Sequence, residues 1–294
     1  MTMGKDKSPE YCLFGAKRLM ALVEDMYDFI DADIDDIEYV HDLRVTSRRI
    51  RAAMNIYSDA FSKRQHKEWK FKIRNITQSL GLARDLDVQI DFLEREFPDK
   101  EGIEYLLASH RERRAQIQPD ILSTLDNLRE SEVLEDMISA CGKVVRKSKG
   151  ISETSGLTYT RANINITQQI DSFLAMDACV YNKKDIEEHH EMRIFAKKLR
   201  YTMEAFADLY PNKLKKEIGV VKKMQDFLGN MHDYDVWMDY IPGFVAENEV
   251  DLNGFMKEIK SRRKDQYEKF RDFYDKKKSS GFFEHLKEVI SYSS

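Results

Sequence analysis

The chain has 294 residues, which is enough for one large domain or two small ones. Hydrophobic residues make up 42% of it and charged residues 34%, while glycine (12) and proline (5) are scarce, a composition that favours an all-helical protein with a substantial core. The net charge of −4 argues against a protein that binds polyanions over its whole surface. Any such binding requires basic side chains to be gathered in one place.

The sequence contains no sign of a membrane or secretory protein. Its N-terminal region carries charged residues throughout, without the apolar stretch of a signal peptide, and no segment is apolar over the length that a bilayer requires. Cys12, Cys141 and Cys179 are far apart and form no CxxC pair, which is typical of single thiols in a reducing compartment. We therefore expect a cytoplasmic protein with no membrane partner.

The first half of the chain reads as a series of helices. Ser8 and Pro9 are typical of the cap and the first position of a helix that runs to about residue 31. Asp35-Asp36-Ile37-Glu38 has the spacing of a capping box and predicts the start of a second helix. A break is expected at the Leu80-Gly81 pair, with Asp85 as the cap of the next helix. Further helices are expected at about 62–80, 85–97, 100–128 and 131–146.

The second half repeats this order after a predicted linker. Residues 146–160, RKSKGISETSGLTYT, are the only long stretch rich in Gly, Ser and Thr. Asp185-Ile186-Glu187-Glu188 predicts another capping box, and Asp233 another cap after a glycine. Helices are expected at about 212–228, 233–247, 251–278 and 281–291, and Pro98, Pro211 and Pro242 fall at predicted helix ends.

An internal repeat links the two halves. Residues 41–61, HDLRVTSRRIRAAMNIYSDAF, align with residues 190–210, HEMRIFAKKLRYTMEAFADLY, and are identical at five positions. A second pair of segments follows, SLGLARDLDV at 79–88 and FLGNMHDYDV at 227–236. The repeat predicts an all-α fold of two four-helix-type bundles, residues 8–145 and 161–292, related by internal duplication and pseudo-twofold symmetry.

The first repeated segment has the pattern of an amphipathic helix with a row of basic side chains. At about 100° per residue its basic residues fall on one side and its apolar residues on the other, and the second copy behaves in the same way. In that copy Glu204 is the main candidate to neutralise a member of the row. The two rows are His41, Arg44, Arg48 and Arg51, and His190, Arg193, Lys197 and Arg200.

The next helix of each half adds further basic residues. One side of the first such helix carries Lys63, Lys67, Lys70 and Arg74. Lys67 corresponds to Lys215 in the second half, and Arg74 corresponds to Lys222. If these residues turn toward the first row, each half contains a cationic groove with two walls, and two facing grooves form a channel. The alternative is that each row is only the solvated side of a surface helix.

The ordered, duplicated motifs resemble the CHAD family (conserved histidine α-helical domain). The motifs are HDLRVTSRRIR with LGLARDLDV, then HEMRIFAKKLRY with LGNMHDYDV, and the resemblance spans roughly residues 10–291. We therefore expect a stand-alone member, without a fused triphosphate tunnel domain. The resemblance implies two four-helix bundles about a pseudo-twofold axis and a basic cleft or pore between them that binds inorganic polyphosphate.

Carried onto matching positions, the resemblance implies that the two rows contact polyphosphate, with Lys67, Arg74, Lys215 and Lys222 as a second wall. No catalytic residue, metal site or cofactor is implied, so the expected function is non-enzymatic. Proteins that associate with polyphosphate would be further partners, and polyphosphate granules a place to find the protein. Because His41 and His190 gain charge as the pH falls, polyphosphate binding is expected to strengthen toward acidic pH.

Three other functions remain open at this stage. His232-Asp233-x-Asp235 resembles a fragment of a metal-dependent phosphohydrolase, although structural roles for the aspartates, as caps or as partners of basic residues, fit the sequence better. A helical scaffold would use the aromatic residues of the last helices, whose spacing favours a core position. Nucleic acid is a possible ligand of any cationic cleft, but few aromatic residues alternate with the basic rows, so specific recognition of bases is not expected.

Overall fold

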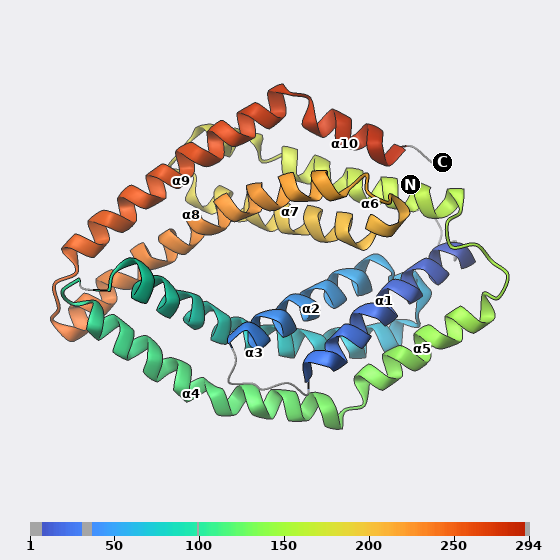
Figure 1. Cartoon of the computed structure of the whole chain (residues 1–294), viewed down its shortest axis with the longest axis horizontal. Helices are drawn as coiled ribbons and strands as arrows, with labels where there is room; N and C mark the ends of the chain where they lie inside the picture. The colour runs from blue at the N-terminus through green and yellow to red at the C-terminus, as the bar shows by residue number, and fades with distance from the viewer. Residues whose placement is uncertain (1–7, 31–36, 99, 292–294) are drawn as a thin grey trace. The chain divides into compact units, whose positions relative to one another are not determined.

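A computed structural model of the protein describes residues 8–30, 37–98 and 100–291. In these ranges the chain forms ten α-helices, with short 3₁₀ turns and no strand (Figure 1), so the all-helical prediction is confirmed. None of the described helices combines the length and the apolar composition that crossing a membrane requires. The helices are α1 (Pro9–Ile30), α2 (Ile37–Ile56), α3 (Lys63–Glu96), α4 (Ile103–Glu130), α5 (Val133–Lys147), α6 (Gly156–Leu174), α7 (Ile186–Ala205), α8 (Lys215–Asn248), α9 (Asn253–Ser279) and α10 (Phe282–Ser291).

The chain divides into two compact units. Unit 1 consists of Met1–Asp99 with Ile103–Thr158, and unit 2 of Lys100–Gly102 with Tyr159–Ser294. Helices α5 and α6 both extend into the predicted linker, so that only residues 148–155 between them are not helical. The internal duplication and the pseudo-twofold symmetry stay predictions.

The core of unit 1 lies where α1 packs against α2 and α5, and where α3 packs against α2 and α4. Trp69 on α3 is fully buried, and its ring meets the ring of Phe61 edge-on at 5.0 Å between centroids. The Trp69 Nε1–H donates a hydrogen bond to Asp136 Oδ2 at 2.8 Å, which ties α3 to α5. The start of α1 is as predicted, since Ser8 Oγ accepts a hydrogen bond from the backbone N–H of Tyr11 at 3.4 Å.

The core of unit 2 is rich in aromatic side chains. Phe173 of α6 packs against Tyr274 of α9 and Phe283 of α10, and Trp237 of α8 meets Phe255 of α9 edge-on. Helix α8 packs against both α7 and α9. The core position predicted for the aromatic residues of the last helices is confirmed for those that are buried, namely Phe270, Tyr274, Phe282 and Phe283. Phe273 is half-buried and its ring packs against Phe227.

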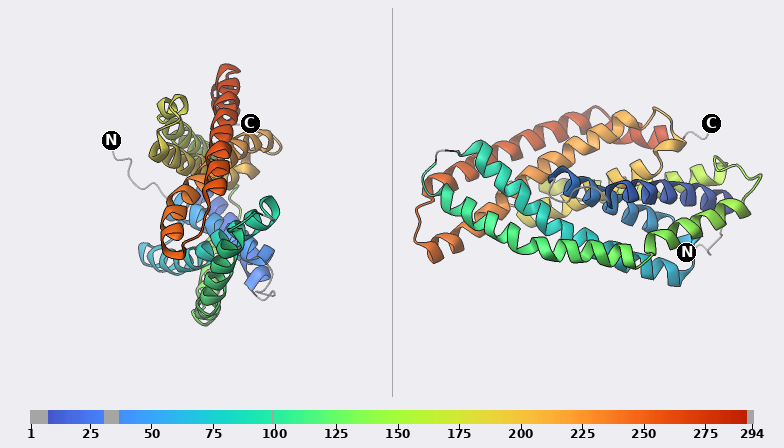
Figure 2. Two further views of the ribbon diagram at one scale, coloured as in Figure 1. Left: turned by 90° about the vertical axis from the view of Figure 1, so that its left-hand side faces the viewer. Right: turned by 60° about the horizontal axis from the view of Figure 1, so that its bottom comes forward.

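The predicted breaks after the Leu-Gly pairs are wrong, because α3 and α8 are each one uninterrupted helix of 34 residues. Figure 2 shows both helices from two further sides. Gly81 and Gly229 lie inside these helices and neither has a positive φ angle. Asp85 and Asp233 therefore cap nothing. Pro242 was expected at a helix end and lies inside α8, because burial of Ile241 and Phe244 continues the packed side of the helix past the proline.

The capping prediction at the start of α7 is correct for the position of the helix and wrong for the cap. Helix α7 begins at Ile186, but the side chain of Asp185 makes no capping hydrogen bond to its first turn. The Asp185 carboxylate instead accepts a hydrogen bond from the side-chain amide of Asn182. The corresponding prediction at Asp35 and Asp36 lies outside the described residues.

Candidate anion-binding site

On α2 the four basic side chains of the predicted row are half-buried along one side of the helix. They are His41, Arg44, Arg48 and Arg51. The apolar residues expected on the opposite side are all buried, which confirms the amphipathic prediction for this helix and the turn after it. These residues are Leu43, Ile50, Met54, Tyr57 and Phe61.

Arg44 turns toward α3, where the second repeat motif lies. Its Nη2 donates a hydrogen bond to Asp85 Oδ1 at 3.3 Å, and its guanidinium group lies beside Gly81. A methyl group at position 81 would be 3.7 Å from Arg44 Nε, so a larger side chain would displace the arginine. The glycine and the aspartate of this motif therefore position a cation of the row.

Arg51 belongs to a group of three arginines. Burial, followed by the charges of Arg74 on α3 and Arg48 on α2, lowers the pKa of Arg51 from its usual value. The contributions of Arg74 and Arg48 mean that each of them lies near enough to Arg51 for its charge to act on that guanidinium group. At this point the row on α2 meets the predicted second wall on α3.

The row on α7 in unit 2 is built in the same way. His190, Arg193, Lys197 and Arg200 are half-buried on one side of the helix, and a methyl group at Gly229 of α8 would lie 3.8 Å from Arg193 Nε. The apolar residues on the other side are all buried, as predicted. They are Met192, Leu199, Met203, Phe206 and Tyr210.

One member of the α7 row is neutralised, as the sequence predicts. Arg200 Nε lies 3.4 Å from Glu204 Oε1, and the guanidinium group lies over the ring of Tyr201 at 4.7 Å from its centroid. Burial raises the pKa of Asp226, and the charges of Lys222 and Arg200 oppose this change, so Asp226 of α8 lies near both Lys222 and a member of the row.

The remaining residues of the second wall are Lys67 and Lys215. Both are exposed near the beginnings of α3 and α8. Lys67 lies seven residues before Arg74 in the sequence, a rise of about 10 Å along a helix. The structure thus brings Arg74 and Lys222 to the rows, whereas for Lys67 and Lys215 it shows no contact with a member of either row.

A histidine outside the predicted set lies against the α7 row. His232 Nδ1 is 3.1 Å from His190 Nδ1, and the two ring centroids are 4.5 Å apart. Burial is the largest cause that lowers the pKa of His232 to about 4, followed by the charges of Arg193, His190 and Lys197. His232 is therefore neutral at physiological pH and completes a cluster of nitrogen-bearing side chains.

In each unit an ion pair ties the long helix to the next one; it is half-buried in unit 1 and buried in unit 2. Arg114 Nε of α4 donates to Asp87 Oδ1 at 2.8 Å in unit 1, and Arg263 Nε of α9 donates to Asp235 Oδ1 at 3.0 Å in unit 2. The second aspartate of each repeat motif thus pairs with a basic residue, which was the structural role favoured from the sequence. Sequence reasoning missed the arginines, although Arg114 and Arg263 are separated by the same 149 residues as the two rows.

Arg263 also contacts a buried histidine. Its Nη2 lies 3.2 Å from His189 Nδ1, and His189 Nε2 lies 2.9 Å from the carbonyl oxygen of Cys179. Because the guanidinium group can only donate, His189 Nδ1 accepts, and its proton sits on Nε2. Burial, and then the charge of Arg263, lowers the pKa of His189. This histidine is neutral and structural, while its neighbour His190 belongs to the row.

Two residues of the fragment that resembles a metal-dependent phosphohydrolase are directed to different partners. His232 contacts His190 on α7, whereas Asp235 pairs with Arg263 on α9. In the described part of the chain no group of three or more histidine, cysteine, aspartate or glutamate side chains is placed to hold a metal ion. The fragment His232-Asp233-x-Asp235 is therefore not assembled as a metal centre here.

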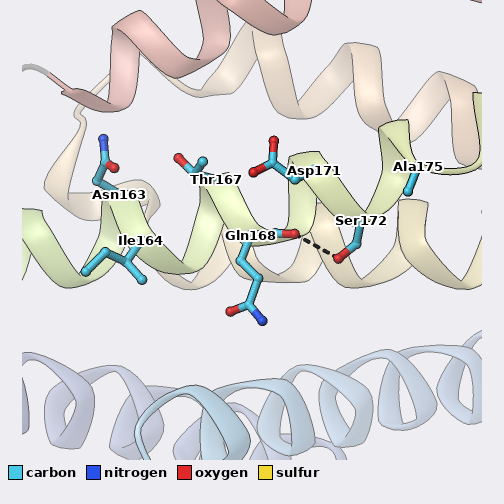
Figure 3. Close-up of a pocket in the computed structure, with 7 residues that line it drawn as sticks. All are labelled: Asn163, Ile164, Thr167, Gln168, Asp171, Ser172 and Ala175. Carbon is cyan, nitrogen blue, oxygen red and sulfur yellow. Dashed lines mark hydrogen bonds between the residues drawn. The ribbon is translucent and has the colours of Figure 1, made fainter. Parts of the chain in front are cut away.

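An open hollow runs along one side of α6 (Figure 3). The residues that line it include Asn163, Gln168 and Asp171, and Ser172 Oγ donates a hydrogen bond to the carbonyl oxygen of Gln168 at 2.8 Å. No lysine, arginine or histidine is among them. This hollow lacks the cations that an anion would need, so the basic rows remain the candidate site.

Comparison with known proteins gives a consistent family. A family model described as the CHAD domain matches residues 19–242. The crystal structure of the CHAD domain from the plant Ricinus communis is similar with a TM-score of 0.59 and 18% sequence identity, covering 89% of this chain and 87% of that one. The structure of PptA from Streptomyces chartreusis is similar with a TM-score of 0.54 and 14% identity, covering 89% of this chain and 95% of that one.

The search of curated proteins found no match. At 18% and 14% identity the two solved structures show the fold alone. The family model covers well over half of the chain and includes both basic rows and both glycine-aspartate motifs. The protein therefore belongs to the CHAD domain family.

Proposed function

We propose that this protein binds inorganic polyphosphate along the basic rows of α2 and α7, without converting it chemically, and that it does so in the cytoplasm. The single observation that carries the proposal is the pair of matched rows, in which four basic side chains are half-buried on one side of α2 and four on one side of α7, with Arg44 beside Gly81 and Arg193 beside Gly229. Such a row is costly in the absence of an anion, so a ligand that neutralises it is expected. The shared cleft implied by the family resemblance stays a prediction, since the proposal requires only the row on each unit.

Polyphosphate suits these rows better than an anion that is recognised through base edges or apolar surface. Each internal phosphate carries a negative charge, and the polymer offers no base edges and no apolar surface. Recognition can therefore rest only on charge and spacing, and arginine forks bind phosphate oxygens with two parallel hydrogen bonds. Rows on rigid helices hold the cations in place before the ligand arrives, which reduces the entropy lost on binding.

The decisive experiment is charge reversal in the rows. We expect Arg48→Glu combined with Lys197→Glu to weaken binding of long-chain polyphosphate by at least about 100-fold at low salt, since two charge-assisted contacts are lost. The same measurement on the unaltered protein is expected to show a strong dependence on salt, with a slope of about −3 in a plot of log K against log [salt] if four phosphates are contacted. Isothermal titration calorimetry measures both.

The matched control is Arg49→Glu combined with Lys198→Glu. These residues occupy equivalent positions in the two repeats, are exposed, and lie on the same helices beside the rows. The two double variants change the net charge equally, so the control removes the effect of overall charge. Equal loss of affinity in both double variants, or a flat salt dependence, would contradict the proposal. Competition with single-stranded DNA distinguishes polyphosphate binding from general binding of nucleic acid, and phosphate release with Mg²⁺ or Mn²⁺ tests for hydrolysis.

A further inference from the structure

Two lysines of unit 2 lie over one phenyl ring where α8 packs against α9. Phe273 of α9 is half-buried and packs against Phe227 of α8, with 5.6 Å between the ring centroids. Lys223 Nζ of α8 lies 5.1 Å from the centroid of Phe273, and Lys277 Nζ of α9 lies 5.5 Å from it. The distance between the two ammonium groups therefore cannot exceed the sum of these two distances.

No carboxylate neutralises either ammonium group. Among the residues that the structure describes, no acidic side chain forms an ion pair with Lys223 or Lys277, and neither Nζ donates a hydrogen bond. The next residue shows the alternative, since Lys278 lies over the ring of Tyr274 but also donates to Asp177 Oδ1 at 2.7 Å. A phenyl face attracts an ammonium group without cancelling its charge, so both groups keep N–H donors for an anion.

The two lysines continue the positive charge of the α7 row around α8. Asp226 of α8 lies near both Lys222 and Arg200, a member of the row. Lys223 follows Lys222 directly, and neighbouring residues of a helix point about 100° apart. This step leads from the side of α8 near the row to the side that packs against α9, where Lys277 stands.

We propose that Lys223 and Lys277, held over Phe273, form a further contact site for a phosphate polyanion and extend the α7 row across α8 to α9. This inference rests on the proposed function and enlarges its site in unit 2. Phe273 is here a positioning residue, because it fixes where the two charges stand and does not itself bind phosphate.

The chemistry of the site favours inorganic polyphosphate over nucleic acid. Binding of single strands relies on bases that stack on open aromatic faces. Phe273 presents its face to ammonium groups instead, and Lys223 also lies 5.9 Å from the centroid of Phe227. What the ligand meets is a pair of cations with N–H donors, which bind phosphate oxygens as point charges.

The extension belongs to unit 2 alone. At the repeat spacing of α3 and α8, the position of Lys223 is occupied in unit 1 by Asn75. At the spacing that relates Arg114 to Arg263, the positions of Phe273 and Lys277 are occupied by Thr124 and Leu128. Unit 1 therefore has neither the ring nor the two charges, and unit 2 is expected to hold the longer stretch of polyphosphate.

The test removes the two charges and keeps the packing. In Lys223→Met combined with Lys277→Met, an unbranched apolar side chain still covers the phenyl rings. We expect this full-length variant to bind long-chain polyphosphate about 10-fold more weakly at low salt, because two charge-assisted contacts are lost. The slope of log K against log [salt] should become less steep by about 1.4, or about 0.7 for each contact. Isothermal titration calorimetry measures both.

Two further variants decide between charge and packing. Lys260→Met combined with Lys276→Met changes the net charge equally at exposed positions of α9 and should bind like the unaltered protein. Lys223→Arg combined with Lys277→Arg keeps both charges and should retain the affinity. Equal affinity in the two methionine double variants, or an equal loss in the arginine variant, overturns the extension and leaves the proposed function standing. Absence of binding by the unaltered protein at low salt overturns both.

Discussion

At the scale of single residues, the site is a compromise between stability and binding. Burial lowers the pKa of Arg51, and the charges of Arg74 and Arg48 lower it further, so Arg51 has two cations near it. Each pair of like charges on a helix surface costs a few tenths of a kcal/mol. A position selected for stability alone would carry a neutral or acidic residue in place of one of these cations.

Replacing one of these arginines should therefore stabilise the protein. We expect Arg48→Gln to raise the free energy of unfolding by about 0.2–0.5 kcal/mol, because repulsion with Arg51 is removed and glutamine is an equally good helix former. Arg49→Gln, one position along and exposed, is the control and should give no such gain. Urea denaturation at low salt measures the effect, and a destabilised Arg48→Gln would show that the cluster is not strained.

The residues of the rows could be predicted from the sequence, whereas their partners could not. A repeated row at helical spacing identifies His190 and Arg193 because periodicity fixes which side of a helix a residue occupies. The contact between His190 and His232 joins two helices, 42 residues apart in the chain. Which side chains meet across such a distance depends on how the helices pack, and a single sequence does not state it. Arg114 and Arg263 are an exception, because the repeat spacing marked them.

At the scale of helices, the glycines of the repeat motifs serve side-chain packing. Leu-Gly followed by aspartate has the local pattern of a helix end and a new cap, which is why a break was expected. In the structure Gly81 lies within α3 and gives room to Arg44, which Asp85 then binds. The local pattern at Gly81 and Asp85 predicts a helix end, whereas the contact of both residues with Arg44 is made by a continuous helix. The tertiary contact determines the structure.

Alanine substitutions distinguish a glycine that lies inside a helix from a glycine that a turn requires. We expect Gly81→Ala and Gly229→Ala to raise the free energy of unfolding by about 0.5–1 kcal/mol each, since alanine favours an uninterrupted helix and a methyl group there meets only ordinary contacts. Gly102→Ala should instead destabilise the protein, because Gly102 has a φ angle of +82° and a methyl group would lie 2.9 Å from the carbonyl oxygen of Asp251. Thermal and urea denaturation measure all three. A loss of stability in Gly81→Ala would mean that α3 is broken at this residue.

At the scale of the whole molecule, a net charge of −4 coexists with rows of concentrated positive charge. The positive charges of α2 and α7 are offset by acidic residues elsewhere in the chain. The proposed function requires such a segregation, because it confines the attraction of a polyanion to the rows. The composition predicted this segregation, and the structure shows where the aspartates of the repeat motifs are directed. Asp87 and Asp235 pair with Arg114 and Arg263, whereas Asp85 pairs with Arg44 of the α2 row.

The pH dependence of stability follows from the buried histidines. Burial lowers the pKa of His110 and His189, and it lowers the pKa of His232 to about 4. In the unfolded chain these three histidines bind protons at about pH 6.5, whereas in the folded protein they bind them only at lower pH. The free energy of unfolding should therefore be greatest above pH 6.5 and should fall as the pH is lowered toward 4.

A single variant isolates one part of this dependence. His232→Asn is expected to flatten the decrease in unfolding free energy between pH 6.5 and pH 4, because a group that titrates only in the unfolded chain has been removed. Urea denaturation at several pH values, without ligand, gives the two curves. Parallel curves for the variant and the unaltered protein would show that His232 binds protons equally in both states.

The two tryptophans of the chain occupy the cores of different units, Trp69 in unit 1 and Trp237 in unit 2. Each unit therefore contains one tryptophan as an intrinsic fluorophore. Replacing either indole by phenylalanine leaves an emission signal that reports on the other unit alone, so that a stopped-flow trace would show directly whether the two lose their structure together or in turn.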